Sequence, residues 1–154
     1  MKVSDILRVK GGTLVTVQSD EPLSRAMNDM AEKDIGSLVV MAKGALAGML
    51  TFREVIQQIV KNGGQVGATL VREAMDAQPL TCTGETDIDE VRRMMLEHHA
   101  RYMPVMEGTM LMGVISFYDV AKAVVDGQNF ENKMLKAYIR DWPEGSDKDA
   151  EDVK

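Results

Sequence analysis

The stretch Gly48-Met49-Leu50-Thr51-Phe52-Arg53-Glu54-Val55 decides the fold, because the chain contains two versions of it. The second version begins 65 positions later and reads Gly113-Val114-Ile115-Ser116-Phe117-Tyr118-Asp119-Val120. Both versions hold a glycine, two apolar residues, a hydroxyl residue, and a carboxylate three residues after the hydroxyl. An apolar run is typical of a buried strand, and the Ser/Thr-x-x-Asp/Glu spacing is typical of a helix start. Each half of the chain therefore predicts a strand that runs directly into a helix.

The repeat continues beyond this stretch in one gapless register. With the same shift, Thr16 aligns with Thr81 and Met30 aligns with Met95. The register holds over about 45 positions and keeps apolar character at the sites between the identities. One unit of this size is too small to bury both faces of its own strands. The sequence therefore predicts two copies that pack sheet on sheet about a pseudo-two-fold axis.

Each copy predicts the element order β-α-β-β-α. Apolar residues recur with the spacing of an amphipathic helix from Leu23 to Ala31 and again from Ile88 to Leu96. Thr86 is the expected N-cap of the second of these helices. The expected strands run from Leu14 to Val17, Ser37 to Met41 and Leu46 to Thr51 in the first copy, and from Leu80 to Cys82, Tyr102 to Met106 and Leu111 to Ser116 in the second.

The expected fold class is mixed α/β (α+β), with an extra C-terminal helix after the two repeats. Residues 1–62 are assigned to the first repeat, residues 63–127 to the second, residues 128–143 to the C-terminal helix, and residues 144–154 to a disordered acidic tail. The extra helix is expected from Phe130 to Arg140, and Trp142-Pro143 is expected to end it.

The composition narrows the function classes. The 154 residues carry a net charge of -6, which disfavours extended binding to nucleic acid or to an anionic membrane. Charge is spread through Met1 to Lys10, so no signal peptide is expected there. No apolar stretch reaches membrane-spanning length. A single cysteine excludes an internal disulfide and fits a reducing, cytoplasmic location.

The duplicated stretch, together with Arg101-Tyr102-Met103-Pro104-Val105 before the second hairpin, resembles the tandem CBS (cystathionine β-synthase-type) domain pair, or Bateman module. The resemblance covers roughly residues 1 to 126. The C-terminal helix is similar to the extension of small stand-alone bacterial proteins of this type. The resemblance implies a regulatory protein without catalytic activity that binds an adenine nucleotide in clefts between the repeats.

Family members bind AMP, ADP, ATP, NAD or S-adenosylmethionine, so one of these is the expected ligand. The resemblance also implies a homodimer and an effector protein that the sequence does not identify. In the family the Ser/Thr of the motif contacts phosphate or ribose, and the Asp takes the ribose hydroxyls. The physical chemistry of the motif agrees with a phosphate contact, because the free N–H groups and the dipole at a helix start favour an anion.

The resemblance assigns candidate nucleotide-binding residues in both copies. In the second copy they are Thr81, Cys82, Arg101, Tyr102, Met103, Pro104, Ser116, Tyr118 and Asp119. In the first copy they are Thr16, Gly36, Ser37, Leu38, Thr51, Arg53 and Glu54. The second set is favoured, because Arg101 offers a cation for phosphate where the first copy has Gly36. Either Tyr102 or Met103 is expected to pack on the adenine.

Several of these residues have a second interpretation. Thr51 and Glu54 match a capping box, which needs no ligand. Arg53 is either a source of charge for phosphate or a solvated residue at a helix start. The whole module is alternatively a dimerisation or interaction module with degenerate sites. Cys82 is expected to be a buried small apolar residue. His98 and His99 are expected to be surface or capping groups at a helix end, since neighbours on a helix do not share a face for a metal.

Overall fold

The computed structural model describes residues 1–11 and 14–140. The chain divides into two units, Met1–Phe117 and Tyr118–Lys154. The first copy holds α1 (Val3–Lys10), β1 (Thr16–Gln18), α2 (Leu23–Lys33), β2 (Ser37–Ala42), β3 (Ala45–Thr51) and α3 (Phe52–Lys61). The second holds α4 (Val71–Ala74), α5 (Ile88–His98), β4 (Tyr102–Glu107), β5 (Met110–Ser116) and α6 (Phe117–Arg140).

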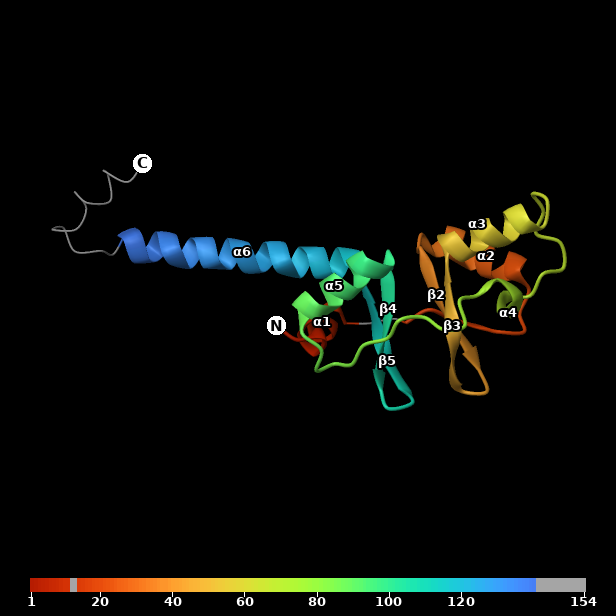
Figure 1. Ribbon diagram of the computed structural model, residues 1–154, viewed down its shortest axis with the longest axis horizontal. Coiled ribbons are helices and arrows are strands. Elements are labelled where there is room, and N and C mark those ends of the chain that lie inside the picture. The colour runs from red at the N-terminus through yellow and green to blue at the C-terminus, as the bar shows by residue number, and fades with distance from the viewer. Residues whose placement is uncertain (12–13, 141–154) are drawn as a thin grey trace. The chain divides into compact units, whose positions relative to one another are not determined.

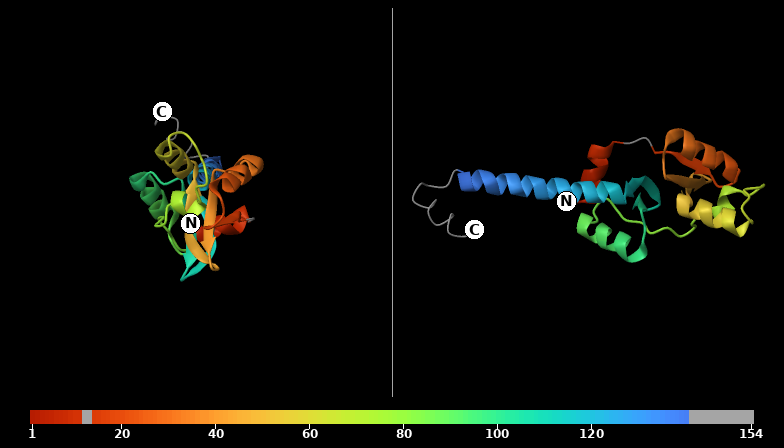
Figure 2. Two further views of the ribbon diagram at one scale, coloured as in Figure 1. Left: turned by 90° about the vertical axis from the view of Figure 1, so that its right-hand side faces the viewer. Right: turned by 90° about the horizontal axis from the view of Figure 1, so that it is seen from above.

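Two antiparallel hairpins form the centre of the first unit. Strand β2 pairs with β3 from Ser37↔Thr51 onward, and β4 pairs with β5 from Tyr102↔Ser116 onward. Both hairpins carry a register shift at the same place in the repeat, after Val40 and after Val105. Strands β3 and β5 contact each other. Helices α2 and α3 lie on the side of the first hairpin that faces away from the second hairpin (Figure 1, Figure 2). The hairpins therefore form the inner layer of the unit.

The first strand differs between the copies. In the first copy β1 begins at Thr16, not at Leu14, and pairs parallel to β2. In the second copy the expected strand from Leu80 to Cys82 is wrong, because only Cys82 pairs, in a single parallel bridge to Val105. The Cys82 N–H donates to the Pro104 carbonyl (3.0 Å), and the Cys82 carbonyl accepts from Met106 N–H (2.8 Å).

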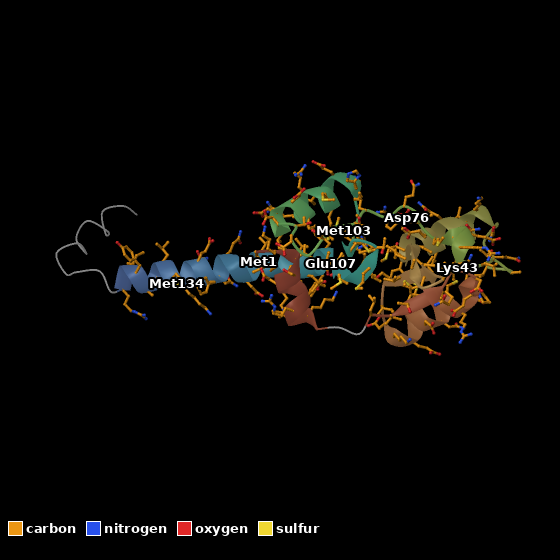
Figure 3. All side chains as sticks on the ribbon, turned by 90° about the horizontal axis from the view of Figure 1, so that it is seen from below. Met1, Lys43, Asp76, Met103, Glu107 and Met134 are labelled. Atoms are coloured by element: carbon orange, nitrogen blue, oxygen red, sulfur yellow. The ribbon has the colours of Figure 1, made fainter. Side chains whose placement is uncertain are left out.

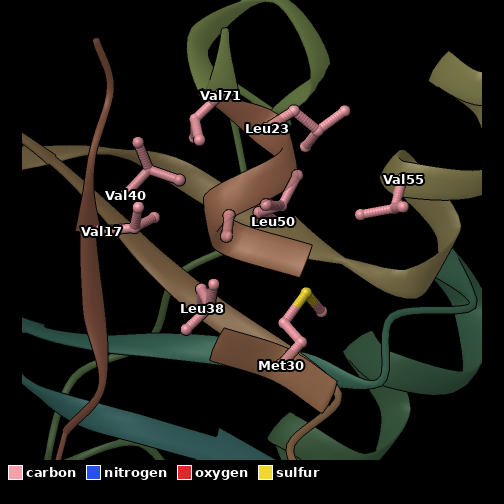
Figure 4. Packing of buried hydrophobic residues seen from close by; sticks show 9 residues of the cluster. Val17, Leu23, Met30, Leu38, Val40, Leu50, Val55 and Val71 are labelled. Atoms are coloured by element: carbon pink, nitrogen blue, oxygen red, sulfur yellow. The ribbon is translucent and has the colours of Figure 1, made fainter. Parts of the chain in front are cut away.

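A cluster of buried apolar side chains fills the first copy between its helices and sheet (Figure 4). The α2 residues Leu23 and Met30 meet Leu38 and Leu50 of the hairpin there. Val71 of α4 belongs to the same cluster and is fully buried. The core of the first copy is therefore closed by a residue that follows the first copy in the sequence.

The first helix of each copy docks on the other copy. Val3 N–H donates to the Thr86 carbonyl (3.0 Å) and Ser4 N–H to the Gly84 carbonyl (3.0 Å), while Ile88 N–H donates to the Met1 carbonyl (3.0 Å). The matching bonds elsewhere are Val71 N–H to Glu21 C=O (2.9 Å), Arg72 N–H to Ser19 C=O (2.9 Å) and Leu23 N–H to Thr69 C=O (2.8 Å). The same three contacts therefore occur twice, with the copies exchanged.

Neither α1 nor α4 was expected from the sequence. The charges between Met1 and Lys10 argue against a signal peptide but do not reveal the helix, in which Val3 and Ile6 form the buried face of α1. Helix α4 is only four residues long, too short for periodicity to show. Both helices are stabilised by contacts with distant parts of the chain, which local sequence does not reveal.

Two expectations about the other helices are wrong. The N-cap of α5 is Asp87, and the Thr86 hydroxyl instead accepts a hydrogen bond from Thr83 N–H (3.1 Å). The closing helix of the second copy and the C-terminal helix are one helix, α6, which passes Gly127 without a break. The expected end at Trp142-Pro143 and the tail from residue 144 lie outside the described residues. Within those residues, no helix is both long enough and apolar enough to span a bilayer.

Substitutions at Gly48 and Gly113, which hold equivalent positions in β3 and β5, test how each strand packs against the segment from the other copy. A Cβ at Gly48 would lie 2.3 Å from the Asp76 carbonyl oxygen, whereas one at Gly113 would meet the end of the Leu7 side chain at 3.0 Å. The backbone of Asp76 is fixed by paired bonds with Met49 (2.9 and 3.0 Å), while a leucine end can rotate. We expect Gly48→Ala to lower the free energy of unfolding by about 2 kcal/mol and Gly113→Ala to lower it clearly less.

Urea denaturation of the wild type and the two variants measures this difference. Equal losses in the two variants would contradict the close approach at Gly48.

Candidate functional site: two clefts between the copies

The larger cleft opens between the start of β4 and the start of α3. It has a volume of about 520 Å³, and we call it the Arg101 cleft. Its lining includes Thr51, Arg53 and Glu54 from the first motif, Arg101 and Tyr102 from the second copy, and Asp76, Gln78, Pro79, Leu80 and His98. The cleft thus combines two guanidinium groups, one helix start, and apolar or aromatic walls.

The smaller cleft opens between the start of β2 and the end of β5. It has a volume of about 410 Å³, and we call it the Lys10 cleft. Its lining includes Lys10 and Leu7 of α1, Val15, Gly36 and Ser37 of the first copy, and Tyr102, Val114 and Ser116 of the second. Among the described residues of this lining, Lys10 is the one that carries a charge, and its Nζ donates to the Val114 carbonyl (3.1 Å).

The two clefts are equivalent in the repeat, and each draws on both copies. Arg101 and Tyr102 of the larger cleft correspond to Gly36 and Ser37 of the smaller, and Thr51 corresponds to Ser116. The candidate residues grouped by copy in the sequence are therefore regrouped by the structure. Arg101 and Tyr102 lie with the motif of the first copy, and Ser116 lies with the strand start of the first copy.

Several candidate residues lie away from both clefts. Leu38 and Met103 are fully buried in the core, and Pro104 is buried next to Met103 in β4. Of the pair expected to pack on adenine, Tyr102 lines the clefts and Met103 does not. Thr16, Thr81 and Cys82 are also absent from both linings.

The candidates Tyr118 and Asp119 lie at the start of α6, in the second unit.

Thr51 and Glu54 form the capping box that their spacing allowed. The Thr51 N–H donates to Glu54 Oε2 (3.0 Å), and the Thr51 hydroxyl bonds to the same oxygen. Glu54 is therefore held at the N-terminus of α3, where a carboxylate also favours the helix dipole. The capping interpretation is confirmed, and it fixes one wall of the Arg101 cleft.

Arg53 joins the two copies at the edge of this cleft. Its Nη2 donates to the carbonyl of His99, which ends α5 in the left-handed conformation (φ 53°). The Arg53 guanidinium therefore has one hydrogen bond within the protein, and four of its five N–H groups remain for other partners. His99 is a helix cap, as expected for this pair, and His98 lines the cleft.

Tyr102 forms the partition between the clefts. Tyr102 and Gly36 line both of them, and a Cβ added at Gly36 would lie 2.3 Å from the Tyr102 hydroxyl oxygen. The absence of a side chain at position 36 therefore makes room for the tyrosine ring. This arrangement depends on how the copies pair, and nothing near either residue in the sequence indicates it.

Sequence reasoning missed some of the lining. Lys10 and Leu7 reach the smaller cleft only because α1 crosses to the second copy. Asp76, Gln78 and Pro79 lie in the segment after α4 and reach the larger cleft through the bonds between Asp76 and Met49. Among residues 1–11 and 14–140, no cluster of three or more His, Cys, Asp or Glu residues is placed to hold a metal ion.

Cys82 is buried, as expected, with 6% of its surface exposed. Its Sγ lies 3.9 Å from the Pro104 carbonyl oxygen. Burial removes water from the thiolate and raises the pKa of Cys82 from 9.0 to about 11.

Comparison with known proteins identifies the repeated unit. The CBS domain family model matches residues 3–61 and 71–126. The chain is 30% identical over 147 residues to the CBS domain-containing protein CBSX3, mitochondrial, of Arabidopsis thaliana, covering 90% of this chain and 71% of that protein. A putative signal-transduction protein with CBS domains from Burkholderia ambifaria superposes with a TM-score of 0.77 and 34% identity, over 83% of this chain and 96% of the other.

A third structure extends the likeness in fold. The CBS domain pair of protein MJ0100, solved in complex with 5-methylthioadenosine and S-adenosyl-L-methionine, has a TM-score of 0.72 at 19% identity. It covers 82% of this chain and 98% of that one.

The raised pKa of Cys82 predicts slow alkylation. At pH 8 the folded protein should react with iodoacetamide roughly hundredfold more slowly than the protein in 8 M urea, because few thiolates form in the folded state. The folded state keeps the proton that the unfolded state loses, so the contribution of this thiol to stability is complete below the unfolded pKa and is lost as the pH rises toward about 11. Similar rates with and without urea would contradict the burial.

Proposed function

Because the chain belongs to the CBS domain family, we propose that it is a regulatory module that binds an adenine nucleotide (AMP, ADP, ATP or NAD) in the Arg101 cleft and catalyses no reaction. The observation that carries the proposal is the pair of guanidinium groups, Arg53 and Arg101, in one cleft with the N-terminus of α3.

The size and polarity of the Arg101 cleft suit a nucleotide. Its volume of about 520 Å³ lies within the range of small-molecule sites. Phosphate oxygens are best held by guanidinium groups, which donate two parallel hydrogen bonds. Arg101 is exposed at the cleft, and Arg53 keeps further donors beyond its bond to His99. The acidic net charge of the chain therefore does not oppose binding, because the positive charge is local.

The remaining lining suits the base and the sugar. Tyr102, Pro79 and Leu80 offer flat or apolar surfaces for an adenine ring. Glu54 and Asp76 supply carboxylate oxygens, which accept hydrogen bonds from ribose hydroxyls. Both carboxylates are already oriented, Glu54 by Thr51 and Asp76 by a bond from Gln78 N–H (3.0 Å). A ligand would then bind a surface that is largely in place.

The Lys10 cleft is the weaker of the two proposed sites. Position 36 has no side chain, so Lys10 is the cation available there, and it already bonds to the Val114 carbonyl. Ser37 and Ser116 provide hydroxyl groups but no further charge. We expect this cleft to bind the same ligands less tightly.

The adenosine compounds bound to protein MJ0100 support the class of ligand. CBS pairs bind ligands that contain adenosine, and each of the two clefts here is lined by residues of both repeats.

We also propose that the protein forms a homodimer and acts on an effector protein. Phe52, Ile56 and Val60 lie at i, i+4 and i+8 on α3, and each is more than half exposed. Phe52 and Ile56 also line the Arg101 cleft. A contact on this face would therefore be sensitive to a ligand in the cleft, so binding would shift the assembly equilibrium.

Replacing Arg101 tests the proposed site. Arg101→Ala should weaken binding of AMP and ATP by roughly tenfold to hundredfold, because a charged hydrogen bond to phosphate is lost. Adenosine, which has no phosphate, should bind the variant and the wild type about equally. Isothermal titration calorimetry measures both, with Arg25→Ala on the exposed side of α2 as the matched control.

A thermal shift with AMP, ATP, NAD and S-adenosylmethionine separates this proposal from its alternative. Ligands that bind the native state raise the apparent melting temperature by mass action. No shift at millimolar concentrations would favour an interaction module with degenerate sites. Equal losses from Arg101→Ala and Arg25→Ala would remove the Arg101 cleft as the phosphate site.

A further inference from the structure

Helix α6 carries a continuous apolar seam. Ala123, Gly127, Phe130, Met134 and Ala137 follow one another at spacings of alternately four and three residues. This spacing is that of the a and d positions of a heptad repeat, whose side chains pack against another helix. Phe130 is 65% exposed and Met134 is 58% exposed. Figure 3 labels Met134 on α6. The seam becomes accessible after Val120, which is buried at 1%, and Ala123 and Gly127 are half-buried.

Charged residues flank this seam in an ordered way. Asp126 and Lys133 lie one heptad apart on the same flank, at position g, and Glu131 lies on the other flank, at position e. The flank therefore changes sign along the helix, from acidic to basic. In coiled coils these flanking charges set the choice and the orientation of the partner.

We propose that α6 pairs with α6 of a second copy of this chain as an antiparallel two-stranded coiled coil. In an antiparallel pair the g positions face each other across the seam. Asp126 then lies beside Lys133 of the partner subunit, and by symmetry Lys133 lies beside Asp126 of the partner subunit. The antiparallel pair therefore gains two attractive contacts, because the g flank of each helix carries one acidic and one basic residue.

The parallel arrangement is disfavoured by the same charges. There a g position faces the next e position of the other helix. Asp126 would lie beside Glu131 of the partner subunit, and the symmetric contact would repeat this repulsion. No residue of the described seam or its flanks supplies an attractive pair to offset it.

The volumes of the seam residues also favour the antiparallel pair. In that orientation each a residue packs beside a d residue, which places Gly127 against Phe130 of the partner subunit and Ala123 against Met134 of the partner subunit. A large side chain then fills the space left by a small one in the two layers named here. A parallel pair would set Phe130 against its own copy and leave a gap between the two Gly127 residues.

The inference rests on the homodimer proposed above and gives it a contact on α6 in addition to the exposed α3 face of Phe52, Ile56 and Val60. It does not depend on nucleotide binding. A chain that stays monomeric at all concentrations would remove both proposals. A dimer whose dissociation constant does not change with the α6 substitutions would contradict the α6 contact alone.

A charge swap on the full chain tests the contact. Asp126→Lys and Lys133→Asp, made singly, should each raise the dimer dissociation constant by roughly tenfold or more, because each replaces two attractions with two repulsions. The double variant, Asp126→Lys with Lys133→Asp, should restore the constant to within about threefold of the wild type. Sedimentation equilibrium measures all three, with Lys136→Asp, away from the seam, as a control for the charge change.

Cysteine cross-linking tests the orientation. A mixture of Ala123→Cys and Met134→Cys chains should form a disulfide between the two variants under mild oxidation, since their Cα atoms then lie within bonding range. Ala123→Cys chains alone should not cross-link. Cys82 is buried in every sample and gives little background.

Three results would overturn the proposal. The first is a dissociation constant that the single charge variants leave unchanged. The second is a double variant that stays as weak as the singles. The third is self-linking of Ala123→Cys chains, which would show a parallel pair.

Discussion

The exchange of short helices between the copies is the constraint on which the first unit depends. Val3 N–H donates to the second copy at Thr86, and Val71 N–H donates to the first copy at Glu21. Each helix thereby adds a buried side chain to a core that is not its own, and Val71 and Val3 are both fully buried. Neither copy can complete its core without the chain segment that precedes the other copy. The two repeats are therefore expected to fold as one cooperative unit, although each has its own sheet.

The position of the clefts follows from this exchange. The hairpins face each other, and each motif lies across from the strand start of the opposite copy, so Thr51 lies near Arg101 and Ser116 near Ser37. A ligand in either cleft touches both copies at once. Such a ligand would bind one relative arrangement of the copies more tightly than others, which is the physical requirement for a ligand to shift a conformational equilibrium. The sensing role proposed here thus comes from the packing of the repeat and not from any single residue.

Local sequence predicted what local contacts determine. Both hairpins were placed to within about a residue, because strand patterns flank turn glycines such as Gly44 and Gly108, whose φ angles are positive. The expected strand at Leu80 failed because a partner strand, and not propensity, decides pairing there. The grouping of the site residues by copy failed for the same reason. Arg101 lies with Thr51 only because the two copies pair. The repeat predicts that the copies pair, but it does not predict which residues of one copy lie against which residues of the other. The sequence predicted two helices where α6 is one, which passes Gly127 without a break although glycine is a poor helix former.

The inequality of the two clefts traces to one pair of equivalent residues, Tyr102 and Ser37. The tyrosine hydroxyl occupies the space where a side chain at position 36 would begin, so a larger residue there would displace the ring. Serine at position 37 has no ring to reach the equivalent place, and position 101 carries a full arginine side chain. A ring on one copy and its absence on the other thus account for a cation in one cleft and none at the matching place in the other. Since Tyr102 borders both clefts, a ligand that moves the ring in one cleft also changes the wall of the other, and the two sites are expected to sense each other through this residue.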